Sequence, residues 1–123
     1  MMHEFDLEER TFQFALNAAR FLRLLQKDFA AFEYAKQAIR AAGSVGANYI
    51  EANESLSDKD FLMRLKISRK ETKEFIYWLR LIKESNAGEI PEGYDFLYNE
   101  AQELLKIFSA IINKKTAPSE DSD

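Results

Sequence analysis

The chain has 123 residues, 46% of them hydrophobic, a length typical of one domain and enough apolar material for a core. It contains no cysteine, which excludes a disulfide framework and thiolate metal sites. It opens with MMHEFDLEE, which lacks the basic start and apolar run of a secretory signal, and charges interrupt every apolar stretch. We therefore expect a soluble cytoplasmic protein that makes no membrane contact.

The net charge of −4 argues against indiscriminate attraction to nucleic acid or anionic membranes. The charge is unevenly distributed, however. Residues 57–83 contain eight basic and four acidic residues, whereas residues 84–123 contain three basic and nine acidic residues. Two interpretations stay open: a basic surface that binds a partner, or a basic and an acidic helix that neutralise each other.

The first predicted helix covers residues 7–27, with Asp6 and Glu9 placed as an N-cap and its partner. Its apolar residues recur at spacings of four, three and four: Phe14, Ala18, Phe21 and Leu25. The second predicted helix covers residues 32–53, and its apolar and small residues keep this spacing through Gly43 and Gly46. Each segment is therefore predicted to be one continuous amphipathic helix.

The two glycines are predicted to lie inside the second helix. A phosphate-binding loop would need a preceding strand and a new helix start, and a Gly-x-x-Gly nucleic-acid clamp belongs in a mixed helix and sheet domain. A glycine inside a helix costs about 1 kcal/mol relative to alanine, so we expect close helix packing to offset that cost at Gly43 and Gly46. Ser44, Asn48 and Glu51 lie one turn apart on this helix and need polar partners if they are buried.

The third predicted helix covers residues 58–84 and starts at the cap pattern of Ser57 and Asp60. Its core face is predicted to consist of Phe61, Leu65, Ser68, Thr72, Phe75, Leu79 and Ile82. A second apolar face is formed by Met63, Ile67, Trp78 and Leu81. Because a helix in a small bundle usually buries one face, we expect the second to contact another subunit; the alternative is scattered surface residues.

A basic stripe also follows the third helix. Its members are Lys59, Lys66, Arg69, Lys73 and Arg80. Residues seven apart drift only about 20° around a helix, so these side chains share one face and are candidate nucleic-acid contacts. A fourth helix is predicted over residues 94–114, and residues 116–123 are expected to form a disordered acidic tail.

The segments RAAGSVGANYIEA and DFLMRLKISRKETKEFIYWLRLI resemble the 23S rRNA-intervening sequence protein family, small four-helix-bundle proteins first noticed as reading frames within bacterial large-subunit ribosomal RNA genes. The family-motif positions on the second helix are Ser44, Gly46, Asn48 and Glu51, and Glu74 matches on the third. The resemblance implies an up-down-up-down bundle that assembles into ring-shaped homopentamers and has no known enzymatic activity. Where some relatives carry Gly-Ser, this chain has Lys70 and Glu71.

A related group, the accessory proteins of diversity-generating retroelements, is strongly basic and binds nucleic acid. The net charge of −4 departs from that strongly basic pattern and weakens the case for nucleic-acid binding. The basic stripe partly restores that case. The resemblance therefore leaves RNA or DNA as a candidate partner beside a second copy of the chain.

An enzymatic function is the alternative to these binding functions. Four-helix bundles hold two metals with inward Glu residues and Glu-x-x-His pairs, and this chain offers Glu51 with Glu54 and Glu71 with Glu74. Its single histidine, His3, precedes the first helix, so the histidine ligands and a Ser-His-Asp triad are missing. We expect no catalytic residue, metal or cofactor, although a small apolar ligand inside the bundle stays open.

The sequence thus predicts an all-α four-helix bundle over residues 1–115. The predicted function is a non-catalytic, self-assembling protein that binds RNA or DNA through the basic stripe. The alternative is an oligomeric scaffold that binds proteins and has no affinity for nucleic acid.

Overall fold

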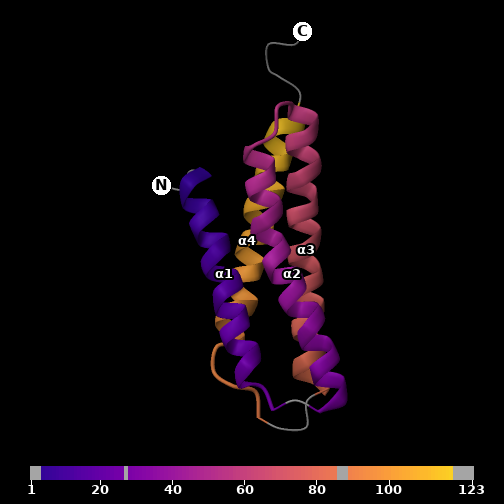
Figure 1. Cartoon of the computed structure of the whole chain (residues 1–123). Coiled ribbons are helices and arrows are strands. Elements are labelled where there is room, and N and C mark those ends of the chain that lie inside the picture. The colour runs from indigo at the N-terminus through magenta and orange to yellow at the C-terminus, as the bar shows by residue number, and fades with distance from the viewer. Residues whose placement is uncertain (1–3, 27, 86–88, 118–123) are drawn as a thin grey trace.

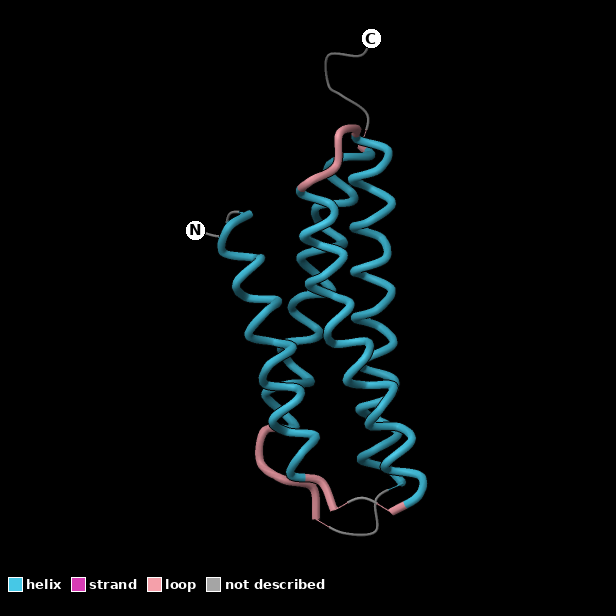
Figure 2. Tube along the Cα trace, in the orientation of Figure 1, coloured by secondary structure: helices cyan, strands magenta, loops and turns pink. Residues whose placement is uncertain are grey.

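A computed structural model describes residues 4–26, 28–85 and 89–117. Its helices are α1 (Glu4–Leu24), α2 (Phe29–Asn53), α3 (Asp58–Ser85) and α4 (Tyr94–Thr116). The helices lie side by side in one elongated bundle, and these ranges contain no strand (Figure 1). The end of α1 and the start of α2 share one end of the bundle, while α2 meets α3 at the other end (Figure 2). The predicted all-α fold with four helices is confirmed.

The predicted boundaries of the first two helices need correction. Helix α1 begins at Glu4, so Asp6 lies inside the helix instead of capping it; no Pro or Gly interrupts the helical backbone there. It ends at Leu24, and Lys27 lies outside the described residues. Helix α2 begins at Phe29, three residues earlier than predicted, because the Asp28 carboxylate accepts a hydrogen bond from the Ala31 N–H at 2.9 Å.

The starts of the last two helices agree with the sequence analysis. The Ser57 hydroxyl accepts a hydrogen bond from the Asp60 N–H at 3.1 Å, as the cap pattern predicts. Helix α4 follows Gly93, whose φ of 108° lies in the left-handed region that favours glycine. Because α4 continues to Thr116, the acidic tail cannot begin at residue 116 as predicted, and residues 118–123 lie outside the described part.

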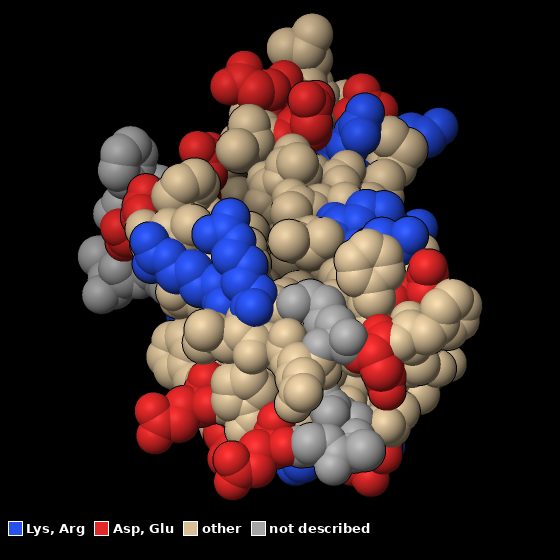
Figure 3. Space-filling view, turned by 60° about the horizontal axis from the view of Figure 1, so that its bottom comes forward, with Lys and Arg blue, Asp and Glu red and all other residues tan. Residues whose placement is uncertain are grey.

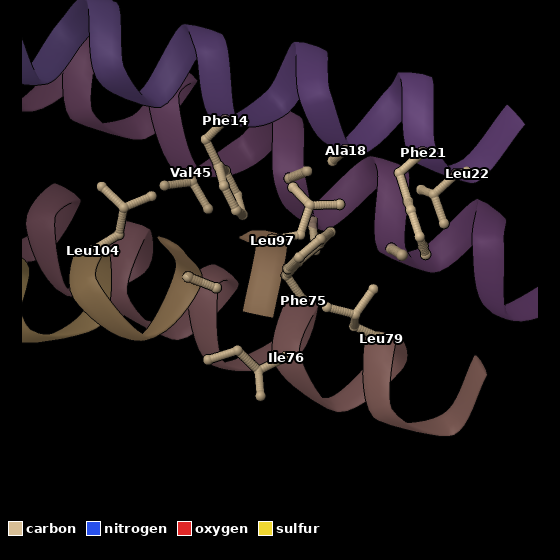
Figure 4. Close-up of a cluster of buried hydrophobic side chains, with 14 of the residues drawn as sticks. Phe14, Ala18, Phe21, Leu22, Val45, Phe75, Ile76, Leu79, Leu97 and Leu104 are labelled. Atoms are coloured by element: carbon tan, nitrogen blue, oxygen red, sulfur yellow. The ribbon is translucent and has the colours of Figure 1, made fainter. Parts of the chain in front are cut away.

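The core runs along the centre of the bundle, and all four helices contribute to it (Figure 4). Phe14 of α1 packs edge-to-face on Phe75 of α3, with ring centroids 4.9 Å apart. The most extensive helix pairing joins α2 and α3. There the buried Ser68 hydroxyl donates to the Val45 carbonyl at 2.9 Å, a bond that requires close backbone approach. The small polar residues of the α3 core face therefore help to set the spacing of this pair.

Gly46 and Gly43 differ in their surroundings, although both lie inside α2. Gly46 is buried, and a Cβ there would lie 3.0 Å from the Thr11 Oγ1 and 3.2 Å from the Thr11 Cβ on α1. Gly43 is exposed, and a Cβ there would meet no atom within 4 Å. Close packing therefore explains Gly46, but the same explanation is wrong for Gly43.

Candidate nucleic-acid interface

The basic stripe lies on one uninterrupted helix, which fixes the spacing of its charges. Lys59, Lys66, Lys73 and Arg80 are exposed and Arg69 is half-buried, as the seven-residue repeat predicts. Leu65, Thr72 and Leu79, which directly precede Lys66, Lys73 and Arg80, are buried in the core. Burial of that core face holds the stripe on the outside of the bundle. Figure 3 shows that Lys and Arg side chains gather in separate groups on one face of the molecule, between groups of acidic side chains.

Within the described residues, the acidic residues of α4 form no ion pair with this stripe. Arg10 of α1 holds Glu100, its Nε and Nη2 lying 2.6 and 2.8 Å from the two carboxylate oxygens. This hydrogen bond raises the pKa of Arg10 above its ordinary value. The Glu103 Oε1 lies 4.0 Å from the Nζ of Lys106 on the same helix. Within the described ranges, none of the five stripe residues forms an ion pair, so their charges are free for a partner.

Two features that the sequence analysis missed extend the stripe. Tyr77 has 57% of its surface exposed and lies one turn after Lys73 and one turn before Arg80, so an aromatic ring is interleaved with the charges. The Lys83 Nζ lies 4.7 Å from the centre of the Tyr94 ring on α4. Burial raises the pKa of the Tyr94 hydroxyl, and the nearby charge of Arg80 acts in the opposite sense. Continuing the helical spacing past Arg80 would have found Lys83.

The candidate subunit face of α3 is only partly available to another subunit. Met63 is exposed, whereas Ile67 and Leu81 are half-buried. Trp78 stacks on Tyr34 of α2, with ring centroids 5.9 Å apart, and packs against the core. Its buried indole N–H has no hydrogen-bond partner within the described residues. Met63 is therefore the residue of this set that an added subunit could reach most directly.

The family-motif residues mostly join α2 to its neighbours. The half-buried Asn48 donates to the Ser44 carbonyl at 2.9 Å, and its Oδ1 accepts from Arg64 of α3 at 3.3 Å. Arg40 of α2 binds Glu74 at 3.3 Å and the buried Glu71 at 3.4 Å. The fifth motif residue, Glu51, is exposed and has no ion-pair partner in the described ranges. The contacts of Arg64 and Arg40 therefore link α2 to α3, whereas the bond from Asn48 to Ser44 lies within α2.

The arrangement of carboxylates bears on the metal alternative. Glu71 and Glu74 are directed to Arg40 across the α2–α3 pair instead of facing other carboxylates. Within the described ranges, no group of three or more His, Asp or Glu residues could hold a metal ion. In the same part of the chain, no helix is both long enough and apolar enough to cross a membrane.

The fold defines an all-α four-helix bundle whose polar side chains mainly link helices or cover its surface. The chain belongs to the 23S rRNA-intervening sequence protein family, whose model matches residues 3–110. It is similar to a solved structure from Bacteroides thetaiotaomicron, a protein of unknown function from the S23 ribosomal protein family. The two chains are 29% identical with a TM-score of 0.80, over 91% of this chain and 99% of the other. No curated protein matches the chain.

Proposed function

We propose that the chain is a non-catalytic, self-assembling bundle that binds RNA or DNA through the basic stripe of α3. The observation that carries the proposal is the set of five cations without an ion-pair partner in the described chain, although α4 carries acidic residues. An interleaved exposed tyrosine adds a ring on which a base can stack. The repeat along one helix keeps these cations on one side of the bundle, where several of them can contact backbone phosphates together.

Assembly would strengthen this binding. In an up-down-up-down bundle that forms a ring, which the family resemblance predicts to be a pentamer, each copy repeats the stripe. Several weak contacts on one nucleic acid then act together, which raises the overall affinity without any new contact type. We place this assembly in the cytoplasm and extend the proposal to a relation with the nucleic-acid-binding accessory proteins of diversity-generating retroelements.

A gel-shift titration with single-stranded RNA, duplex RNA and duplex DNA at about 50 mM salt tests the proposal. The unchanged protein should shift at least one probe, and the affinity should fall steeply as salt is added. Lys66→Glu combined with Lys73→Glu should abolish the shift while leaving the oligomer mass and the melting temperature unchanged. If each of these lysines contacts one duplex phosphate, together they contribute about 1.8 to the slope of log K against log salt measured for the unchanged protein.

A matched control places the same charge reversal elsewhere. Arg20 and Arg23 are exposed on α1, away from the stripe, and neither has an ion-pair partner in the described ranges. Arg20→Glu with Arg23→Glu should therefore retain the shift, although the net charge changes by the same amount. Equal loss of binding in both double variants would show attraction to total charge instead of a site on α3.

The second candidate function is a protein-binding scaffold without nucleic-acid affinity. Several large apolar side chains on α1 and α2 are exposed, including Phe12, Phe32 and Ile39, and such surface is typical of protein contacts. If no probe shifts at low salt, and the reversal of Lys66 and Lys73 alters only the melting temperature, the scaffold becomes the better interpretation.

A further inference from the structure

A line of residues along the outside of α2 is largely uncovered by the rest of the chain. It follows the spacing of three and four that keeps residues on one side of a helix. We call it the α2 outer face; it consists of Phe32, Lys36, Ile39, Gly43, Ala47, Ile50 and Glu54. Its three large apolar members are 52%, 46% and 48% exposed, in that order along the chain. Near one end, an apolar hollow of about 170 Å³ lies between α1 and α2.

Gly43 lies at the centre of this face and is not explained by contacts inside the bundle. A glycine inside a helix costs about 1 kcal/mol relative to alanine. At Gly46 the approach of Thr11 accounts for that cost, but a Cβ at Gly43 would meet nothing within 4 Å. A small residue between exposed Ile39 and Ile50 leaves room for another helix to approach closely from outside.

The charges on the face have opposite signs at its two ends. Lys36 lies at the end near the start of α2, and its nearest carboxylate is that of Glu33 at 3.4 Å, a half-exposed pair of small energetic value. Glu54 lies at the other end, with Glu51 one turn before it. Neither acid has an ion-pair partner among the described residues. Two such faces attract each other only when they run in opposite directions.

We propose that a second copy of the chain packs its α2 outer face on this one, antiparallel, with the two Gly43 residues at the crossing point. Counting outward from that point, Ile39 of each copy lies opposite Ala47 of the other, Lys36 lies opposite Ile50, and Phe32 lies opposite Glu54. The long Lys36 side chain reaches one turn farther along, to the Glu54 carboxylate of the other copy. The large side chains fill the space beside the small ones, and both charge pairs are opposite in sign. The contact is isologous, so it joins copies in pairs.

This inference extends the self-assembly in the proposed function and does not depend on nucleic-acid binding. A ring of five needs a head-to-tail contact, which an isologous contact cannot supply. The two contacts are compatible, because pairing through α2 then joins one ring to another. Without a ring, the same contact gives a particle of twice 14.3 kDa.

A charge exchange tested by light scattering distinguishes this contact from others. Lys36→Glu places two carboxylates one turn apart at each end of the proposed contact, and Glu54→Lys places two amines one turn apart there. Each variant should lower the mass by half and weaken pairing about tenfold or more, since two favourable ion pairs become repulsive. Mixing the two variants should restore the mass. In the mixed pair, the glutamate introduced at position 36 faces the lysine introduced at position 54, and the retained Lys36 faces the retained Glu54.

Two further measurements guard against a variant that merely misfolds. Lys106→Glu reverses the charge of an exposed α4 side chain outside the proposed contact, and this variant should keep the mass of the unchanged protein. Gly43→Gln, whose Cβ would meet no atom of another helix within 4 Å, should keep or raise the melting temperature at low concentration yet lower the mass. Unchanged mass in both single charge variants, or no restoration on mixing, overturns the α2 contact. Neither result affects the gel shift, so failure of this inference is separate from failure of nucleic-acid binding.

Discussion

Gly46 and Thr11 determine how closely α1 approaches α2. Because a Cβ at Gly46 already lies 3.0 Å from the Thr11 Oγ1, a larger side chain must push the helices apart. We expect Gly46→Leu to lower the free energy of unfolding by about 1–3 kcal/mol or more, the usual cost of overpacking. Urea unfolding of the variant beside the unchanged protein measures this loss.

Gly43 supplies the matched substitution in the same helix. A Cβ at Gly43 meets no atom within 4 Å, so Gly43→Ala should raise the free energy of unfolding of the separate chain by up to about 1 kcal/mol. The free energy of unfolding should be measured at low protein concentration, where pairing between copies does not add to the stability. Equal destabilisation at both glycines would contradict the packing role assigned to Gly46.

The sequence predicted that both glycines are helical, but it did not distinguish their environments. Unbroken spacing of apolar residues through Gly43 and Gly46 is enough to predict a continuous helix. Whether either glycine faces α1 depends on how α2 is rotated against Thr11. That rotation is a property of the whole packed bundle and leaves no local signal in the sequence.

At the scale of elements, Arg40 links α2 to α3 through one buried and one half-exposed carboxylate. Arg40→Ala leaves Glu71, which is 7% exposed, without a cation. We expect a loss of about 1–3 kcal/mol in the free energy of unfolding, the range for a buried polar group left unpaired. Adding Glu71→Gln should recover part of this loss, because the unpaired buried charge is then removed.

A double-mutant cycle by urea unfolding measures the coupling of Arg40 and Glu71. Lys106→Ala is the control, since Lys106 and Glu103 form an exposed pair at 4.0 Å that should contribute little. A loss at Arg40 no larger than that at Lys106 would mean that water replaces the guanidinium. The pair would then not be a link between the helices.

The start of a helix was predicted well only where the periodic apolar residues begin close to the capping residue. Ser57 precedes the buried face of α3 closely, and its capping bond forms as expected. Asp28 was missed because Phe29, the first residue of α2, is 85% exposed and does not belong to the core pattern. The capping chemistry was present in the sequence, but the apolar periodicity used to locate the helix started later.

For the whole molecule, self-assembly through α3 predicts a mass several times 14.3 kDa at micromolar concentration. Met63→Glu should lower that mass without loss of melting temperature, because Met63 is 49% exposed. Trp78 is unsuitable for this test, since it stacks on Tyr34 inside the chain and its replacement would disturb the fold. A monomeric unchanged protein in light scattering would contradict assembly, and an unaltered mass for Met63→Glu would exclude this face.

The exposure of the candidate nucleic-acid surface was predictable, but its electrostatics were not. Seven-residue spacing was sufficient to place Lys59, Lys66, Lys73 and Arg80 outside the bundle. Whether the acidic residues of α4 neutralise these basic side chains depends on which side of α4 the acidic residues lie. Glu100 is held by Arg10 of α1, a pairing between residues 90 positions apart that no local pattern reveals.

The unequal contacts between the helices imply that α1 and α4 separate from each other before the α2–α3 pair opens. Helices α2 and α3 share the most extensive contact, whereas α1 and α4 share the least, with Arg10 and Glu100 joining them by two hydrogen bonds. In hydrogen–deuterium exchange, the amides of α1 and α4 should therefore exchange earlier than those near Ser68 and Val45, which should exchange only on global unfolding. Replacing Arg10 by alanine should accelerate exchange in α1 and leave the α2–α3 pair almost unaffected.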